Sequence, residues 1–343
     1  RWAMVTGTTL CAASLIGLAA LPPSMWLWTI LWGAGMGFGL GTAGQVTIMN
    51  TVTLWFSKRR AFAIGIVMTA GTIGGMVGQP LFAYLIKELG KWEVGWLGSG
   101  LIAVVGLIAV FFLKSKPSDY GQHIDGVSPE EAAAAGPEKK AAAKTYRATE
   151  SWTLAEAMRT RQFWFLTLTW CAFSMSIYIV TAHGLLHMTD LGYTRMQAAW
   201  VLSFFVLGGL SRLVIGYIGD IIEPRWLISL LLAAAVICLF IFWQAPSITA
   251  LAVVTFIHGA CYGSGALVLV PACTGNYYSA GSFAKLNSVM YPMNIGFAAI
   301  VPAGAGYIHQ FTKSYDLAFI IIIGLLAVSF LGSLTLSPPV KAK

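Results

Sequence analysis

Ten long runs of apolar residues limit what this chain can fold into. Each is about as long as the roughly 20 residues that a helix needs to cross a bilayer. Strands of a membrane barrel alternate in polarity over about ten residues, whereas these runs are apolar on every side, so helices are the spanning element that fits. We predict an all-α membrane protein with ten transmembrane helices. They comprise residues 3–21, 25–54, 61–86, 94–113, 163–188, 198–218, 226–243, 248–272, 283–309 and 317–334.

One long hydrophilic stretch divides the runs into four and six. Within it, the Ala-, Glu- and Lys-rich residues 128–144 favour a flexible or loosely helical linker. Near its end, Thr153 and Glu156 have the spacing of a capping box, which predicts a short surface helix. The resulting organisation is an N-terminal four-helix bundle at residues 1–113, a linker at residues 114–161 and a C-terminal six-helix bundle at residues 162–343.

The basic residues indicate the orientation in the membrane. When the linker is assigned to the cytoplasm and the spans alternate, 16 of the 21 Lys and Arg residues fall on the cytoplasmic side. Four fall on the other side, and Arg212 falls inside a span. Because basic loops stay in the cytoplasm, we predict a multi-pass protein of the plasma membrane, the inner membrane of a bacterium, with the linker and the C-terminus cytoplasmic. The net charge of +8 therefore reflects membrane edges and predicts no nucleic-acid partner.

Two glycine-rich segments indicate an internal duplication. WGAGMGFGLG in the second run and IHGACYGSGA in the eighth share the pattern Gly-Ala-x-x-Gly-x-Gly, and each is followed by a polar junction and another span. Parallel repeats are common in transporters. The alternative is chance, because small residues recur in membrane helices wherever two backbones pack closely.

The pattern resembles the major facilitator superfamily, which implies two six-helix bundles around a central pathway. In that family a loop reads G-x-x-x-D-R-x-G-R/K, and the second half of this chain carries Gly216, Asp220 and Arg225 at the matching places, with Ile221 where a basic residue is usual. Arg1 would be the tail of the first-half copy. The resemblance assigns these four residues, Gly216, Asp220, Arg225 and Arg1, to a gating motif. It also implies twelve helices, so we expect that two precede Arg1.

Arg212 is the candidate for substrate binding. Asp220 is eight residues away, about 12 Å along a helix, which is too far for a direct pair. An arginine near the bilayer centre is costly and usually marks a transport pathway, although its side chain could instead extend to the membrane edge. Within the superfamily, the segment before Arg212 resembles that before an arginine of oxalate–formate exchangers and monocarboxylate carriers, through Gly208, Gly209 and Ser211. The resemblance implies that Arg212 binds an anion.

Other polar residues inside the spans are candidate cavity groups. Oxalate exchangers carry a lysine where this chain has Asn294. Arg212 is therefore the one cation expected to face the cavity, and a single cation favours a monocarboxylate over a dicarboxylate. His258 fits either packing or a substrate or proton site. His183 and His187 are spaced like a metal pair, but a poor one, so we predict no metal and no cofactor. The substrate-binding set is Arg212, Asn294, Tyr291, His258, Gln45 and Tyr178, with Asn50 and Tyr262 as further cavity groups.

These observations predict a secondary active transporter of small organic anions, most of all a monocarboxylate, that works by alternating access as a monomer. A dicarboxylate or formate-type anion exchanger, an anion channel and an intramembrane hydrolase are the alternatives. An enzyme is disfavoured, because CYGSGA around Ser264 only approaches the serine-protease motif and the spans hold no paired aspartates. Coupling to a proton or to a counter-anion stays open.

Overall fold

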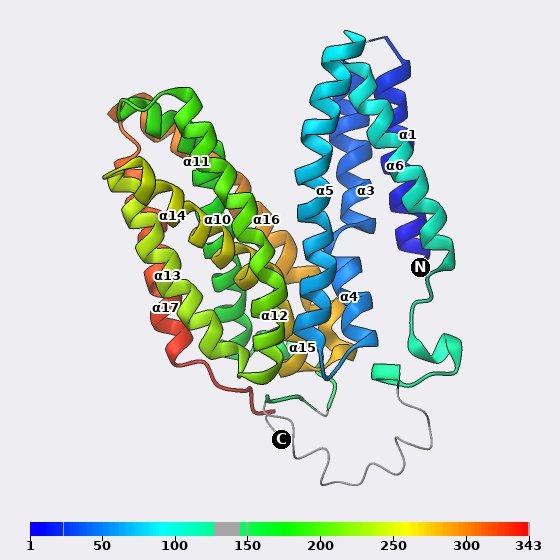
Figure 1. The fold of residues 1–343 in the computed structure, drawn as a ribbon. Coiled ribbons are helices and arrows are strands. Elements are labelled where there is room, and N and C mark those ends of the chain that lie inside the picture. Colours follow the sequence, from blue (N-terminus) through cyan, green and yellow to red (C-terminus); the bar gives the residue numbers. More distant parts are fainter. Residues whose placement is uncertain (23, 127–144, 149, 342–343) are drawn as a thin grey trace. The chain divides into compact units, whose positions relative to one another are not determined.

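Every regular element of the described chain is a helix (Figure 1). The structure is a computed structural model that describes residues 1–22, 24–126, 145–148 and 150–341, apart from the side chains of residues 79, 80 and 83. The linker segment predicted at residues 128–144 lies outside the described residues. The capping box is confirmed: Thr153 and Glu156 cap α9 (Leu154–Met158) in both directions.

In the described part of the chain, nine helices are long and apolar enough to cross a membrane. They correspond to nine of the ten predicted spans. The remaining one, residues 25–54, is helical but broken into four successive segments. These are α2 (Met25–Trp28), the π-helix η1 (Thr29–Met36), α3 (Gly37–Ala43) and α4 (Gln45–Trp55).

Packing divides the chain into two compact units. Unit 1 holds residues 1–57 and 73–136, and unit 2 holds residues 58–72 and 137–343. The first part of α5 (Arg60–Leu89) therefore packs with unit 2, whereas the sequence analysis assigned all of residues 1–113 to one bundle. The cause lies in the contacts of this segment, since glycines of α5 and α12 (Arg212–Ile221) bring the two backbones together.

In unit 1, α1 (Trp2–Ala20) packs against α6 (Glu93–Phe112) and against the broken second span. Small residues make this possible, since Gly7 lies directly against α3 and Gly39 lies directly against Cys11. Trp28, Trp32 and Trp96 form an aromatic group in which ring centroids are 5.0 to 5.7 Å apart. Two short 3-10 helices follow, η2 (Pro117–Tyr120) and η3 (Ile124–Gly126).

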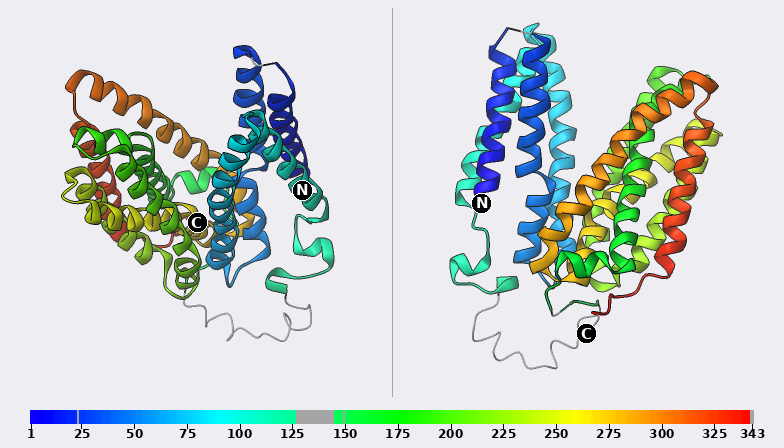
Figure 2. Two further views of the ribbon diagram at one scale, coloured as in Figure 1. Left: turned by 45° about the horizontal axis from the view of Figure 1, so that its top comes forward. Right: turned by 180° about the vertical axis from the view of Figure 1, so that it is seen from behind.

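Unit 2 is built around α10 (Arg161–Asp190), which packs along both α16 (Ala280–Thr312) and α17 (Asp316–Leu334) (Figure 2). Gly208 and Gly259 let α11 and α14 approach until each glycine meets the other backbone. Its core includes Phe163, Trp170 and Tyr277, all fully buried. The other helices are α11 (Arg195–Gly208), η4 (Gly209–Ser211), α13 (Pro224–Gln244), α14 (Ile248–Cys261), the π-helix η5 (Tyr262–Leu269) and α15 (Val270–Tyr278).

The π-helices lie in or beside both glycine-rich segments of the proposed repeat. η1 contains Gly33, and η5 contains Gly263 and Gly265. The wider π-turn is rare and is found mostly at functional sites. Neither segment was predicted to depart from an α-helix, because hydropathy does not distinguish the two helix types.

Candidate functional site

Arg212 opens α12 and is almost completely buried, with 9% of its surface exposed. Its Nη1 donates to the carbonyl oxygen of Met68 at 2.7 Å and to Oγ1 of Thr72 at 2.6 Å, both on α5. Its Nε is buried and has no hydrogen-bond partner among the described residues. No carboxylate of the described chain forms an ion pair with it. A buried, hydrogen-bonded cation without a counter-charge is therefore present within unit 2.

Two glycines make room for the guanidinium group. A Cβ at Gly263 would lie 2.8 Å from Nε of Arg212, and a Cβ at Gly209 would lie 3.1 Å from its Nη2. Gly209 belongs to the 3-10 turn that joins α11 to α12, and Gly263 belongs to η5. The irregular turns at both places thus bring backbone, instead of side chains, against the charged group.

Three tyrosines lie close together in this region. Tyr262 lies within electrostatic range of Arg212, and Tyr178 and Tyr291 lie within that range of Tyr262. Tyr291 also packs on Trp170, with ring centroids 5.7 Å apart. The structure therefore brings three of the predicted substrate residues, Arg212, Tyr178 and Tyr291, into one group with Tyr262 at its centre. We call these four residues the arginine–tyrosine cluster.

Asn294 and His258 are buried in unit 2 with unused hydrogen-bonding atoms. Asn294 is 2% exposed, and its Oδ1 has no partner among the described residues. His258 is 3% exposed, and neither ring nitrogen makes a hydrogen bond of ordinary geometry there. Its ring and that of Tyr262 both pack on Phe205. Buried polar groups are nearly always satisfied, so both residues stay candidates for the predicted substrate site.

Gln45 and Arg1 belong to unit 1. Gln45 begins α4 directly after the break at Gly44, and its Nε2 lies 3.9 Å from Sδ of Met49. The guanidinium of Arg1 lies over the rings of Trp2 and Phe111, at 5.4 and 6.0 Å. For both residues the functional roles stay predictions.

The predicted motif in the second half is a contact with α5. Gly216 lies so close that a Cβ would be 2.8 Å from the carbonyl oxygen of Ala61. Asp220 accepts hydrogen bonds from the backbone N–H groups of Ala61 and Phe62, at 3.0 and 2.9 Å. These are N–H groups of the first turn of α5, so the carboxylate caps that helix and complements its dipole. Arg225 instead donates to the carbonyl oxygen of Leu336 at 2.6 Å.

Three histidines meet at the other end of unit 2 around Tyr315. His183 donates from Nε2 to the carbonyl oxygen of Pro302 at 2.8 Å, so its Nδ1 accepts from the Tyr315 hydroxyl at 3.3 Å. His187 donates from Nε2 to the carbonyl oxygen of Trp243 at 3.0 Å. His309 stacks on Tyr315 and lies 3.0 Å from Oδ2 of Asp190. We call this the histidine cluster. Within the described residues no group of ligands suited to a metal ion occurs.

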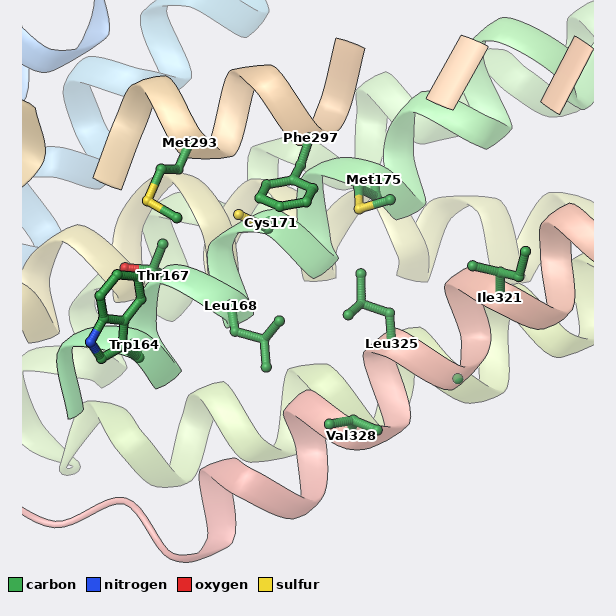
Figure 3. A pocket seen from close by; sticks show the side chains of 11 residues that line it. Trp164, Thr167, Leu168, Cys171, Met175, Met293, Phe297, Ile321, Leu325 and Val328 are labelled. Atoms are coloured by element: carbon green, nitrogen blue, oxygen red, sulfur yellow. The ribbon is translucent and has the colours of Figure 1, made fainter. Parts of the chain in front are cut away.

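An apolar pocket of about 570 Å³ lies among α10, α16 and α17 (Figure 3). Its lining includes Met175, Met293, Phe297 and Leu325, and no charged side chain. Thr167 is its one hydroxyl residue, and that hydroxyl is bonded to the Phe163 carbonyl. Because its lining is apolar and uncharged, this pocket is suited to apolar groups and not to an anion, and none of the predicted substrate residues lines it.

Comparison with known proteins assigns the chain to a family. The sequence profile of the Major Facilitator Superfamily matches residues 1–210 and, in a second match, residues 184–343. The chain belongs to the Major Facilitator Superfamily. The two matches cover both halves of the chain, and the expected all-helical superfamily fold is thereby confirmed.

Characterised superfamily members are similar over most of the chain. Monocarboxylate transporter 13 of Bos taurus is 24% identical over 340 residues, which are 94% of this chain and 70% of that one. The oxalate:formate antiporter of Oxalobacter formigenes is 27% identical over 252 residues, 71% of this chain. This chain spans about half of the antiporter, 52% of its length. The structure of the fucose:proton symporter FucP of E. coli matches with a TM-score of 0.66 at 14% identity, covering 97% of this chain and 82% of that one.

Membership in the superfamily makes the chain a multi-pass membrane transporter and not an enzyme. The geometry at Ser264 agrees, because its hydroxyl is fully buried and is bonded to that of Ser211 at 3.0 Å. The sequence did not predict that Thr72 and Met68 neighbour the site. No local signal could have found them, since each is an ordinary residue of its own helix and only the crossing of helices brings it to the cluster.

Proposed function

We propose that the carrier moves a small monocarboxylate across the membrane by alternating access, with Arg212 as the binding group for the carboxylate. The observation that carries this proposal is the buried guanidinium of Arg212, which has hydrogen-bond acceptors but no counter-charge among the described residues. A guanidinium stays protonated at any physiological pH and matches a carboxylate with two parallel hydrogen bonds. At close range and intermediate dielectric the attraction is about 4 kcal/mol, which selects anions and still lets them leave.

The surroundings favour a substrate with one negative charge. In the described spans of unit 2, Arg212 is the one Lys or Arg residue that lies away from the span ends. The tyrosine hydroxyls near it supply neutral donors for a second polar group on the substrate. The names of the relatives support a small carboxylate as the substrate, because one is a monocarboxylate transporter and another an oxalate:formate antiporter.

Uptake of labelled monocarboxylates into proteoliposomes tests the proposal. Arg212→Ala is expected to abolish uptake while the protein stays folded and inserted, and Arg212→Lys is expected to leave weak uptake, because it keeps the charge but loses the two-pronged geometry. Arg195→Ala is the matched control, since Arg195 is exposed at the start of α11. Parental uptake by Arg212→Ala would refute the proposal.

Two further experiments address the charge of the substrate and the coupling of its transport to a proton or to a counter-anion. Asn294→Lys adds a second cation and is expected to shift preference from a monocarboxylate to a dicarboxylate, measured as competition between acetate and oxalate. Uptake with and without a pH gradient, and with and without internal anion, distinguishes proton symport from anion exchange. A steady anion current without either gradient would indicate a channel instead.

A further inference from the structure

The hydrogen bonds of Arg212 join two helices that come from different halves of the sequence. Both acceptors of Nη1, the carbonyl oxygen of Met68 and the hydroxyl of Thr72, belong to α5, whereas Arg212 begins α12. Thr72 is also the last residue of the α5 segment that packs within unit 2. The candidate binding group is therefore also a tie between α5 and α12.

On the side of this tie toward the start of α5, glycines bring the backbones of the two helices into direct contact. A Cβ on Gly65 of α5 would lie 2.6 Å from the backbone oxygen of Arg212, and Gly216 of α12 meets α5 in the same way. Asp220 then caps α5 at its first turn. Along this seam the backbone contacts and the cap leave no room for a ligand, and the guanidinium of Arg212 lies at its end.

A carboxylate needs two N–H groups on one edge of the guanidinium. A Cβ on Gly263 would lie 2.8 Å from Nε of Arg212. The backbone of Gly263 therefore covers the edge of the guanidinium that contains Nε. The other edge contains Nη1, whose hydrogens are taken by Met68 and Thr72. Bidentate binding at that edge therefore has to displace one acceptor. Thr72 is the one that can turn away, because its hydroxyl moves by side-chain rotation, whereas the Met68 carbonyl is fixed in the helix.

We infer that Thr72 is a positioning residue whose hydroxyl occupies the place of a substrate carboxylate oxygen in the empty carrier. Binding exchanges a neutral acceptor for a charged one, which makes a stronger hydrogen bond, and it removes the Thr72 bond between α5 and α12, so that only the bond to the Met68 carbonyl remains. Substrate binding is thereby coupled to the seam that has to change when the carrier opens. This inference rests on the proposed binding role of Arg212.

Thr72→Val tests it, because valine has the shape of threonine but no hydroxyl to compete with the substrate. The KM for monocarboxylate uptake is expected to fall about tenfold, the size of a hydrogen bond to a charged group, and Thr72→Ser is expected to restore the parental KM. Thr69→Val is the matched control on the same helix, because the Thr69 hydroxyl bonds only to the Gly65 carbonyl of its own helix. Its KM is expected to stay parental.

An unchanged or raised KM in folded Thr72→Val would overturn the inference, and so would an equal fall in Thr69→Val. If valine prevents correct assembly, Thr72→Ala removes the same acceptor and decides the matter with the same measurement. Failure here is distinct from failure of the proposed function. If Arg212→Ala abolishes uptake but Thr72→Val leaves KM unchanged, Arg212 binds the substrate and Thr72 plays no part.

Discussion

The arginine–tyrosine cluster and the histidine cluster lie in the same unit and are both polar groups inside an apolar bundle, yet they differ in how fully they are bonded. In the histidine cluster, His183 uses both ring nitrogens, and His187 and His309 each have a partner. In the arginine–tyrosine cluster the Nε of Arg212 lacks an ordinary partner among the described residues, and elsewhere in unit 2 so do Oδ1 of Asn294 and both ring nitrogens of His258. A satisfied network holds helices together, whereas spare hydrogen-bonding atoms mark candidates for the proposed binding site, except the Nε of Arg212, which the Gly263 backbone covers.

The sharpest test of this contrast is His183→Ala, which removes both bonds that join α10 to Pro302 and Tyr315. We expect the free energy of unfolding to fall by about 2–3 kcal/mol, from two lost hydrogen bonds and the partners left unsatisfied, while the substrate KM stays unchanged. Denaturant titration of the purified protein followed by tryptophan fluorescence measures the loss. His123→Ala, at an exposed position in unit 1, is the control. A stable His183→Ala carrier with impaired substrate affinity would reverse the assignment.

Tyr262→Phe tests the opposite side of the comparison, because it deletes one hydroxyl at the centre of the arginine–tyrosine cluster and keeps the ring. We expect KM to rise about tenfold, the value of one hydrogen bond to a charged ligand, with an unchanged unfolding midpoint. Tyr217→Phe is the matched control, since Tyr217 is 53% exposed and lies on α12 outside the cluster. A large loss of stability with parental KM would make Tyr262 a structural residue.

His258→Gln sharpens the boundary of the site. The imidazole shares its contact on Phe205 with Tyr262, so loss of the ring is expected to raise KM less than Tyr262→Phe does. Because the ring has no carboxylate partner among the described residues, a pH dependence found in the parental carrier is expected to persist. Initial rates across a pH series measure both effects. Loss of that pH dependence would assign the coupling proton to His258.

Asp190→Asn is expected to have the smallest effect. The Asp190 and His309 side chains are 49% and 32% exposed, so their ion pair contributes roughly 0.5 kcal/mol or less to stability. Denaturant titration of the parental and variant proteins measures the loss. A loss of stability comparable with that of His183→Ala would show that side-chain exposure does not predict how much a contact of this cluster contributes to stability.

The spans, the short capped helix and the candidate cation followed from the sequence because each depends on local properties. Transfer of an apolar run into a bilayer depends on the residues of that run alone, and a capping box depends on residues three apart, as Thr153 and Glu156 show. Arg212 was identifiable for the same reason, since a charge within an apolar run is visible in any hydropathy profile. The resemblance to the superfamily was confirmed by the family match.

What only the tertiary structure decided is which groups meet. Thr72 and Met68 reach Arg212, and Asp220 reaches the first turn of α5, because glycines let α5 and α12 cross at close range. His183 and His187, four residues apart in sequence, bond to different helices instead of sharing a metal ion. The physical reason is that the hydrophobic effect specifies burial without direction. Hydrogen bonds specify direction, but their partners are fixed only once the helices have packed.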